Sequence, residues 1–388
     1  MGKIDEMIKQ LCPEGVKNFT LKELCLSIKT GKLNANAKDE DGIYPFFTCD
    51  ENPYRINEYA FDTEAILVTG NGSQVGHINY YNGKFNAYQR TYVLSDFIDK
   101  VNIFFVYHFF KAYLKEYIIV NSKKGSIPYI TLPMLQDFEI PLPPLPIQEA
   151  IVEILDKFDR LSAELQAELQ ARKTQYEYYR NQLLTRFAPD QQVKEYSLGE
   201  LGTFTRGTGL QKSDFVEEGF PCIHYGQVHT FYKTFADKTK SFTSLDLAKK
   251  LKKAKKGDLI IATTSEDVCA CCKATAWLGD TEVAISGDSY MYSHSQNPKY
   301  MAYLFQTEEF AKQKSKVATG AKVVRVSGEA MAKFRFMFPS LSEQARIVSI
   351  LDKFEALVND LSQGLPAEIE AVKEQYEYYR NKLLKFEI

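Results

Sequence analysis

The chain has 388 residues, 45% of them hydrophobic and 13% aromatic, and a formal net charge of −2. These values are typical of a globular protein of two domains, and the charge alone neither favours nor excludes nucleic acid as a partner. No apolar run approaches the roughly 18 residues of a membrane span, and the N-terminus lacks a signal-peptide layout. The seven irregularly spaced cysteines indicate reduced thiols. We therefore expect a cytoplasmic protein without a membrane partner.

Residues 1–145 are predicted to form a first, mostly β domain. An apolar strand, AILV at Ala65–Val68, leads into the polar loop TGNGSQ at Thr69–Gln74, and a basic glycine loop, NSKKGS at Asn121–Ser126, follows late in the domain. The first loop lacks both the GxGxxG spacing and a following helical pattern, so a surface turn is favoured over a nucleotide-binding loop.

A long helix is predicted over residues 146–187, after the stiff PLPPLP run at Pro141–Pro146. Apolar residues recur there at steps of three and four from Ile151 to Phe187, which is the pattern of one helix face. No glycine or proline interrupts Gln148–Phe187, so the helix should form a rod of roughly 55 Å at ~1.5 Å per residue.

Residues 188–339 are predicted to form a second mixed, mostly β domain that shares a weak common pattern with the first. The paired segments are LKEL at Leu21–Leu24 with LGEL at Leu198–Leu201, YPFF at Tyr44–Phe47 with FPCI at Phe220–Ile223, and AILV with DLIIA at Asp258–Ala262. A second helix is predicted over residues 340–388, where Gly364 and Pro366 indicate a kink or a restart with Pro366 in its first turn.

An internal duplication relates the two halves of the chain. QYEYYRNQLL at Gln175–Leu184 returns as QYEYYRNKLL at Gln375–Leu384 with nine of ten residues identical, and ILDKF begins at Ile154 and again at Ile350. The offsets are 200 (375 − 175) and 196 (350 − 154), so the first helix is shorter by four residues, about one turn. Because neither apolar stripe is stable in water alone, we expect an α+β fold with two antiparallel helices that form a coiled coil. Their pseudo-twofold symmetry would place the two domains at opposite ends.

The chain resembles, over nearly its whole length, the specificity subunit of type I restriction-modification systems. The resemblance rests on the duplication, on PLPPLPIQEAIVEILDKF and PSLSEQARIVSILDKF, and on LPAEIEAVKEQYEYYRNKLL, from which the first helix departs with LQAELQA at Leu165–Ala171. It implies two target-recognition domains that each read one half of a bipartite asymmetric DNA site, and two long helices that set the spacer. It further implies double-stranded DNA and two methyltransferase (modification) subunits as partners, with restriction and translocase subunits in the full complex.

The chain itself is expected to be non-catalytic. It has no GxxxxGK[ST] loop, no glycine-rich methyl-donor motif and no Asn/Asp-Pro-Pro-aromatic tetrapeptide, so the methyl donor, ATP and magnesium are expected on partner subunits. Cys269, Cys271 and Cys272 suggest zinc, but their CxCC spacing is not that of a zinc finger, and buried thiols are favoured over a metal site. A self-contained DNA adenine methyltransferase and a coiled-coil protein adaptor stay open as alternatives.

DNA contacts are predicted on polar loops, because base readout needs donors and acceptors on rigid loops and affinity comes from phosphate contacts. The candidates are, in the first domain, Asn71, Ser73, Gln74, Gln89, Arg90, Lys123 and Lys124, and, in the second, Arg206, Gln227, His229, Thr264, Ser265, Glu266, Lys322 and Arg325. A short helix within Ser244–Gly257 is also predicted, with Leu247, Leu251 and Ala254 on its inner face. Its lysines Lys249, Lys250, Lys252 and Lys253 form either a phosphate track or a merely solvated face.

The tyrosine-rich ends of the two helices have two interpretations. They are additional core beneath a domain, or they are a docking face for a partner subunit, because tyrosine is enriched in interface cores. The predicted partner-interface residues are Tyr176, Tyr179, Leu183, Tyr376, Tyr379 and Leu383. If the domains grip DNA, the tandem AELQAELQ at Ala163–Gln170 is a ruler, since four residues add ~6 Å of helix and one base step is roughly 3.4 Å.

Overall fold

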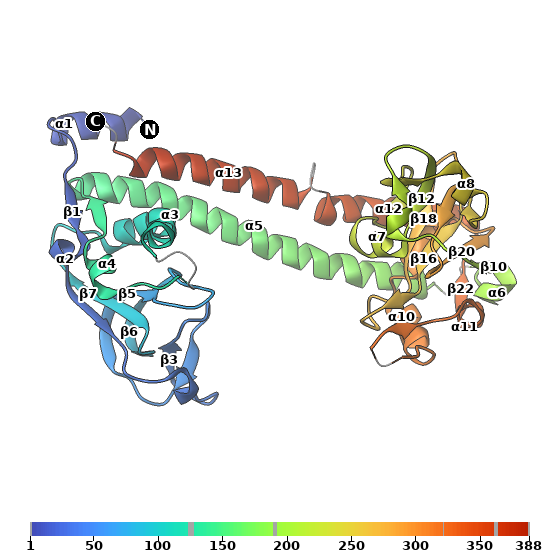
Figure 1. Cartoon of the computed structure of the whole chain (residues 1–388), viewed down its shortest axis with the longest axis horizontal. Coiled ribbons are helices and arrows are strands. Elements are labelled where there is room, and N and C mark those ends of the chain that lie inside the picture. The colour runs from blue at the N-terminus through green and yellow to red at the C-terminus, as the bar shows by residue number, and fades with distance from the viewer. Residues whose placement is uncertain (1, 123–127, 189–191, 321, 361–363, 387–388) are drawn as a thin grey trace. The chain divides into compact units, whose positions relative to one another are not determined.

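The computed structural model describes residues 2–122, 128–188, 192–320, 322–360 and 364–386, which divide into two units. The first unit comprises Met1–Gln166 together with Glu368–Ile388, and the second comprises Ala167–Ala367. Most of the last helix therefore belongs to the unit that contains the N-terminus. Each unit combines one β-rich domain with helical segments from both copies of the repeat (Figure 1).

A six-stranded sheet with the order β2-β7-β5-β6-β3-β4 is the framework of the first unit. Its strands are β2 (Cys25–Thr30), β3 (Tyr44–Phe47), β4 (Tyr54–Ile56), β5 (Phe61–Thr69), β6 (Ile78–Ala87) and β7 (Thr91–Phe97). Only β3 and β6 pair in parallel; the other paired strands are antiparallel. The AILV segment of β5 is buried on both faces, because Ile66 and Val68 enter one apolar cluster and Ala65 and Leu67 enter another.

The helices of this domain share an apolar cluster with one face of the sheet. They are α1 (Gly2–Leu11), α2 (Leu21–Leu24), α3 (Ile103–Asn121) and α4 (Leu132–Gln136), with a 3-10 turn η1 (Ala35–Ala37) and the antiparallel strand pair β1 (Asn18–Thr20) and β8 (Glu139–Pro141). The Asn102 side chain accepts a hydrogen bond from the backbone N–H of Phe104 and so caps the start of α3. The apolar side chains of α3 and the first turns of the long helix share the cluster that contains Ile66.

The second unit repeats this plan with shorter strands. It contains two five-stranded sheets, β10-β20-β16-β18-β13 and β11-β14-β12-β19-β15, and two separate strand pairs, β17-β21 and β22-β9. The strands are β9 (Lys194–Ser197), β10 (Gly202–Arg206), β11 (Phe215–Val216), β12 (Phe220–Ile223), β13 (Phe235–Ala236), β14 (Ser241–Thr243), β15 (Lys253–Ala254), β16 (Leu259–Ala262), β17 (Thr264–Ser265), β18 (Lys273–Trp277), β19 (Val283–Ile285), β20 (Ser289–His294), β21 (Val324–Arg325) and β22 (Arg335–Phe338). The helices are α6 (Leu198–Leu201), η2 (Lys212–Asp214), α7 (Tyr225–Thr230), α8 (Leu245–Ala248), α9 (Pro298–Leu304), α10 (Glu308–Ser315) and α11 (Gly328–Ala332).

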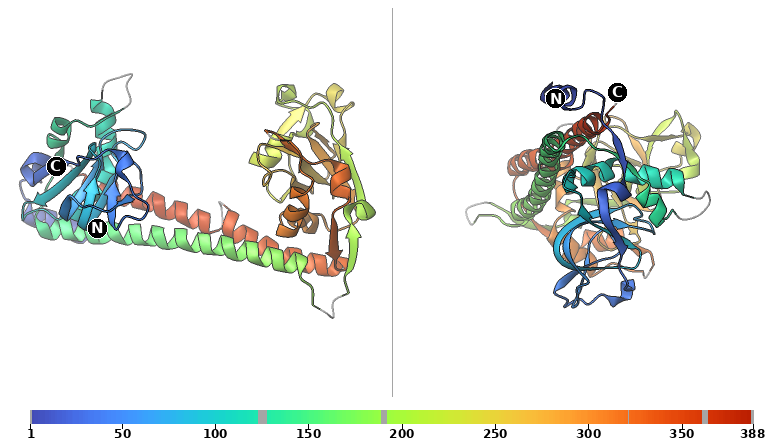
Figure 2. Two further views of the ribbon diagram at one scale, coloured as in Figure 1. Left: turned by 90° about the horizontal axis from the view of Figure 1, so that it is seen from below. Right: turned by 90° about the vertical axis from the view of Figure 1, so that its left-hand side faces the viewer.

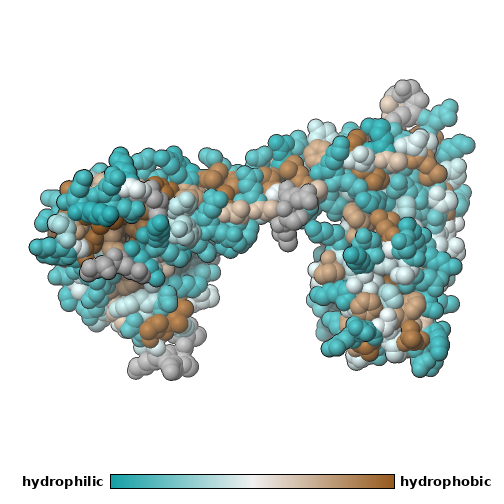
Figure 3. All heavy atoms as spheres, turned by 90° about the horizontal axis from the view of Figure 1, so that it is seen from above, coloured by the Kyte–Doolittle hydropathy of each residue, from teal (hydrophilic) through white to brown (hydrophobic). Residues whose placement is uncertain are grey.

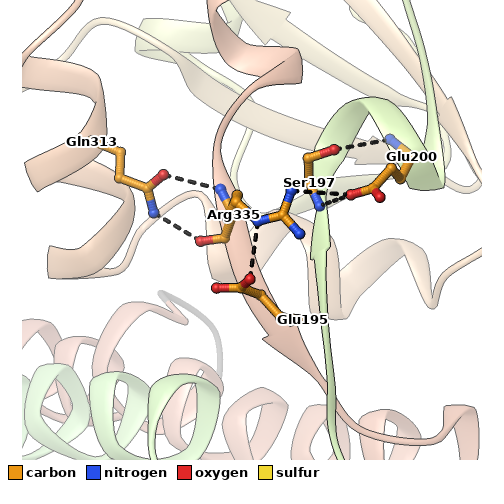
Figure 4. A network of polar contacts seen from close by, with 5 residues as sticks. All are labelled: Glu195, Ser197, Glu200, Gln313 and Arg335. Carbon is orange, nitrogen blue, oxygen red and sulfur yellow. Dashed lines mark hydrogen bonds and ion pairs between the residues drawn. The ribbon is translucent and has the colours of Figure 1, made fainter.

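Arg335 ties the β9–β22 pair to its surroundings (Figure 4). Its guanidinium lies 3.0 Å from Glu195 and 3.4 Å from Glu200, and the Gln313 side chain hydrogen-bonds both its backbone N–H and its carbonyl. Glu200 also accepts from the backbone N–H of Ser197, which caps α6. The strand that leads into the last helical region is thus fixed to α6 and α10.

The spacer helices follow the predicted pattern. Helix α5 (Leu145–Thr185) is continuous over 41 residues. The second copy is broken into α12 (Leu341–Asn359) and α13 (Leu365–Leu384), as Gly364 and Pro366 predict. A Cβ on Gly364 would lie 2.5 Å from the carbonyl oxygens of Ala356 and Leu357, so only glycine fits this break.

The helices pack antiparallel within each unit (Figure 1, Figure 2). In the first unit the ring of Phe158 on α5 lies 5.5 Å from that of Tyr379 on α13. In the second, the ring of Phe354 on α12 lies 5.7 Å from that of Tyr179 on α5. Phe158 and Phe354 occupy equivalent positions of the repeat, and so do Tyr179 and Tyr379. The same phenylalanine–tyrosine contact therefore occurs in both units with the two copies of the repeat exchanged, which confirms the internal pseudo-twofold symmetry. The expected placement of the domains at opposite ends stays a prediction.

Candidate nucleic-acid interface

In the first unit, backbone hydrogen bonds bring five polar loops together. The N–H of Gly70 donates to the carbonyl of Arg90 (2.9 Å), that of Gln89 to Leu33 (2.9 Å), and that of Tyr88 to Phe47 (2.8 Å). Asn71 forms an isolated antiparallel bridge with Tyr129. We call this surface, residues 30–34, 48–50, 70–74, 88–90 and 129, the first edge.

Several predicted DNA-binding residues meet at the first edge. Asn71, Gln89 and Arg90 lie on neighbouring loops, and Ser73 and Gln74 are exposed in the turn that follows Asn71. The Gln89 amide donates to Asn34 (2.8 Å), and the Asn71 amide oxygen accepts from the thiol of Cys49 (3.0 Å). Asn34, Cys49 and Tyr129, which no sequence motif marks, also belong to the first edge. Lys123 and Lys124 lie outside the described residues.

In the second unit the corresponding loops form a second edge, residues 206–212, 224–229, 263–267, 286–288 and 324–325. The N–H of Thr263 donates to the carbonyl of Asp288 (3.1 Å), that of Ser286 to Ile223 (3.3 Å), and Thr264 pairs with Arg325. An open concavity of about 520 Å³ lies here, lined by Gly209, Leu210, Gln211, Lys212, His224, Tyr225, Ser286, Gly287 and Asp288. A surface loop assembly with donors, acceptors and a hollow can meet the edges of base pairs.

Arg206, Thr264, His229 and Asp288 form the polar centre of the second edge. The guanidinium Nε of Arg206 donates to the carbonyl of Gly287 (2.9 Å), and its Nη2 lies 3.9 Å from the Asp288 carboxylate. That carboxylate also accepts from the Thr264 hydroxyl (3.2 Å), and the Nε2 of His229 lies 3.0 Å from the Thr264 carbonyl. Asp288 and Gly287, which no sequence motif marks, therefore link the predicted residues Arg206 and Thr264, and His229 contacts Thr264 directly.

The remaining predicted residues of the second unit differ in exposure. Ser265 is half-buried, and Glu266, Lys322 and Arg325 are exposed on adjoining loops. Gln227 is used inside the protein: its amide oxygen accepts from the backbone N–H of His224 (3.0 Å) and its amide nitrogen donates to Ser241 (2.7 Å). Both polar atoms of the half-buried Gln227 thus take part in bonds within the protein, and its assignment as a base reader stays a prediction.

Burial sets the protonation of two groups at these edges. The buried side chain of His224, with Lys212 nearby, has its pKa lowered, so a neutral imidazole is favoured, and its Nδ1 accepts from the N–H of Gly226. Burial raises the pKa of the Cys49 thiol, which favours the neutral thiol at the first edge. Neither group adds charge at neutral pH, so the charges of the edges come from arginine, lysine and carboxylate side chains.

The predicted lysine-bearing helix is wrong beyond its first turn. Helix α8 ends at Ala248, and Lys253–Ala254 form strand β15, which pairs with β19. Lys249, Lys250, Lys252 and Lys253 therefore do not share one helix face, so the predicted phosphate track is not formed as a helical stripe. Lys249 pairs with Asp246 (2.8 Å), and the ammonium of Lys253 lies 5.2 Å from the ring centroid of Phe220.

The predicted partner-docking face is partly contradicted. Tyr176 is 5% exposed and Leu383 is 4% exposed, so both belong to the apolar cores of their units, and Leu183 and Tyr376 pack against those cores. The exposed rings are Tyr178 and Tyr378, each 59% exposed, with Tyr179 at 41% and Tyr379 half-buried. On the face shown in Figure 3, hydrophobic residues are exposed along the helices between hydrophilic ones. Each unit thus leaves one tyrosine of the repeat exposed on its helices, Tyr178 in the second unit and Tyr378 in the first.

The cysteines that suggested zinc are used otherwise. Cys271 and Cys272 are buried, as expected for structural thiols, whereas Cys269 is exposed. The buried ammonium of Lys314 donates to the carbonyls of Cys269 and Cys271 (both 2.8 Å) and so fixes this loop. Across the part of the chain that the structure describes, no group of three or more His, Cys, Asp or Glu side chains could hold a metal ion. Within the same residues, no helix has the length and apolarity that crossing a membrane requires.

Comparison with known proteins gives one consistent result. A family model described as "Type I restriction modification DNA specificity domain" matches residues 13–172 and again 190–371. A putative type I restriction enzyme specificity subunit of Haemophilus influenzae is 30% identical over 370 residues, covering 89% of each chain. The EcoR124I/EcoR124II specificity subunit of Escherichia coli is 33% identical over 252 residues, covering 62% of this chain and 60% of that one.

Solved structures share the fold. The type I restriction-modification S subunit of M. genitalium aligns over 96% of both chains with a TM-score of 0.57 and 18% identity. A chain from a study of complex assembly and conformational transition in the type I R-M system aligns over 97% of this chain and 99% of that one, with a TM-score of 0.64 and 16% identity. At these identities the match concerns the fold alone.

Proposed function

Because the chain belongs to the family of type I restriction-modification specificity subunits, we propose that the first edge reads one half of a bipartite asymmetric DNA site and the second edge reads the other. The domains that carry the edges are residues 1–145 and 188–339, with the spacer helices at residues 146–187 and 340–388. Recognition would follow the usual division between phosphate contacts, which position the protein, and base contacts, which specify the sequence.

One observation carries this proposal. The same backbone hydrogen bonds assemble the two edges, since Gly70 to Arg90 in the first unit corresponds to Thr263 to Asp288 in the second. The side chains that these bonds present are nevertheless different. Two copies of one framework with different donors and acceptors are what two non-identical half-sites require.

The partners supply the chemistry in this proposal. Two methyltransferase subunits would bind the methyl donor and modify the DNA, and restriction and translocase subunits would use ATP and magnesium. Two docking regions are proposed, one on the helical surface around Tyr178 in the second unit and one around Tyr378 in the first, because tyrosine is enriched in interface cores. The seven cysteines are all unpaired, which fits a cytoplasmic complex.

Helix α5 is the proposed ruler between the half-sites. It is continuous over 41 residues and contains the tandem AELQAELQ segment within its uninterrupted length. A helix without a break transmits a change of length along its axis, at ~1.5 Å per residue.

A domain exchange tests the proposal. Residues 1–145 would be replaced by the corresponding domain of a related specificity subunit, and the complex with its methyltransferase would be expressed in cells. Sequencing of modified adenines should show one half-site replaced and the other retained. If both halves or neither half changed, the assignment of one half-site to each domain would be overturned.

A further inference from the structure

The two edges can be aligned residue by residue through their strand pairing. The last pair between β5 and β7 precedes the bond from Gly70 to the Arg90 carbonyl, and the last pair between β16 and β20 precedes the bond from Thr263 to the Asp288 carbonyl. Arg90 and Asp288 therefore occupy the same position in the two domains. One domain places a cation there and the other places an anion.

A second aligned position lies on the adjacent strand. Thr30 is the last residue of β2 to pair with β7, and Arg206 is the last residue of β10 to pair with β20. The first edge thus combines a threonine with Arg90, whereas the second edge combines Arg206 with Asp288. At these two aligned positions the positive charge lies on different strands, and the second edge has a carboxylate at the position that Arg90 occupies in the first.

The contacts of Asp288 explain what this carboxylate does. It lies 3.9 Å from the Nη2 of Arg206 and accepts from the Thr264 hydroxyl (3.2 Å), while the neighbouring Gly287 carbonyl accepts from the Nε of Arg206 (2.9 Å). The Arg206 side chain is anchored by one hydrogen bond at its Nε, faces the Asp288 carboxylate at 3.9 Å, and is still 63% exposed. These two contacts favour an orientation in which its outer guanidinium edge faces solvent, as bidentate donation to a base requires.

A carboxylate on a DNA-facing surface has an electrostatic cost. It repels phosphates and so lowers sequence-independent affinity, which depends on the positive charge that neutralises the backbone. Its benefit must then lie in specificity, through the orientation of Arg206. Arg90 in the first domain is exposed and occupies the position equivalent to Asp288. Thr30 of β2 occupies the position equivalent to Arg206, so the aligned side chain on that strand is uncharged.

We infer that Asp288 is a positioning residue that aims Arg206 at a guanine in the second half-site, and that Arg90, at the equivalent position, is itself the reader in the first. This inference rests on the proposed function, because it presupposes that the second edge meets base pairs. It assigns to Asp288 a role in discrimination between sequences rather than in affinity.

The test compares Asp288→Asn, Arg206→Ala and the double variant, each assembled with its methyltransferase, on DNA duplexes randomised in one half-site. Asp288→Asn should lower discrimination at one base pair of the second half-site by about fivefold or more, whereas Arg206→Ala should lower it at the same pair within the roughly 5- to 150-fold range of a lost bidentate contact. The double variant should lose no more than Arg206→Ala alone. Affinity of Asp288→Asn for unrelated DNA should be equal to or about twofold above wild type, because one negative charge is gone.

Asp280→Asn is the matched control. Asp280 lies in the same unit and pairs with Lys256 (2.7 Å) at an exposed site away from the second edge. Its replacement should change neither discrimination nor affinity. Uniform weakening by Asp288→Asn on all sequences would overturn the positioning role and leave the proposed function intact. Absence of any second half-site preference in the wild-type complex would overturn the proposed function itself.

Discussion

Replacing Gln344 with methionine should destabilise the second unit by about 3 kcal/mol, because its buried amide satisfies backbone groups that have no other partner nearby. The side chain is fully buried near the start of α12. Its oxygen accepts from the N–H of Asn297 (3.0 Å), and its nitrogen donates to the Pro339 carbonyl (3.0 Å) and to the amide oxygen of Gln296 (2.7 Å).

The magnitude follows from what methionine leaves behind. It fills a similar volume, but the Asn297 N–H and the Pro339 carbonyl would each lose their partner at about 1–3 kcal/mol, whereas the Gln296 side chain can turn to water. The apolar side chain returns about 1 kcal/mol or less. The free energy of unfolding should therefore fall by about 3 kcal/mol, because these bonds are lost at the junction between the second domain and its helix.

The single tryptophan of the chain reports on this unit. Trp277 is 1% exposed in the second unit, so its fluorescence follows the unfolding of that unit in urea. With a slope of roughly 2–3 kcal/mol/M, the midpoint should fall by about 1 M. Gln170→Met, on the exposed face of α5, is the control and should leave the midpoint in place. A Gln344→Met midpoint within about 0.3 M of wild type would refute the reasoning, since the slope makes that shift less than about 1 kcal/mol.

Four further outcomes are expected. Arg90→Ala should relax preference at one base pair of the first half-site by about 1–3 kcal/mol, measured by binding to single-base variants, and uniform weakening would instead assign Arg90 to a phosphate. One additional AELQ unit after Gln170 should lengthen the unread spacer by one or two base pairs, since it adds ~6 Å of helix, and mapped methylation with an unchanged spacer would contradict the ruler. Burial lowers the pKa of His294 to about 4, below its ordinary 6.5, so the folded state binds a proton at this side chain less readily than the unfolded state. The resulting contribution to the unfolding free energy, at most about 3 kcal/mol, is fully present above pH 6.5 and is lost as the pH falls towards 4. His294→Gln should therefore flatten the dependence of the unfolding free energy on pH, and an unchanged dependence would contradict this role of His294. Replacement of Tyr178 and Tyr378 by alanine should reduce co-purification of methyltransferase subunits, and retention of full stoichiometry would exclude both docking regions.

The long helices could be predicted because their signal is repeated many times. An apolar residue at every third or fourth position over 41 residues outweighs local exceptions. Gly364 and Pro366 mark the break between α12 and α13 for reasons that are purely local. Buried β5 and β16 are apolar runs bounded by polar loops, so they were also visible in the sequence.

The lysine-rich segment shows where such patterns fail. Leu247, Leu251 and Ala254 fit a helical spacing of four and three, and Leu251 and Ala254 are indeed buried. The same spacing also fits one helical turn followed by a short strand. Pairing of Lys253–Ala254 with β19 decides between them, and strand formation depends on such non-local partners more than on intrinsic preference.

The recognition residues were predictable only in part for a similar reason. Turn chemistry located the loops that contain Asn71, Arg90 and Thr264. It could not locate Asp288, because the importance of that residue comes from Arg206, which is 82 positions earlier (288 − 206) and meets it only through the pairing of β10 with β20. The exposure of the repeat tyrosines could not be predicted for the same reason. Their spacing indicates the helix face on which they lie, but it does not indicate which of the rings are covered by a domain.

The duplication separates what the fold needs from what the edges read. Gln148 and Gln344 are identical, fully buried, and bind equivalent backbone groups in the two units. Arg90 and Asp288 are also equivalent, yet they differ in charge and lie at the partly exposed edges. A change at the glutamine position costs about 3 kcal/mol of unfolding free energy, whereas an exposed side chain on a loop usually changes it by less than about 0.5 kcal/mol. The edges can therefore acquire new donors and acceptors independently in each unit while the domain-to-helix junctions stay fixed, which is the physical condition for reading an asymmetric site with a symmetric framework.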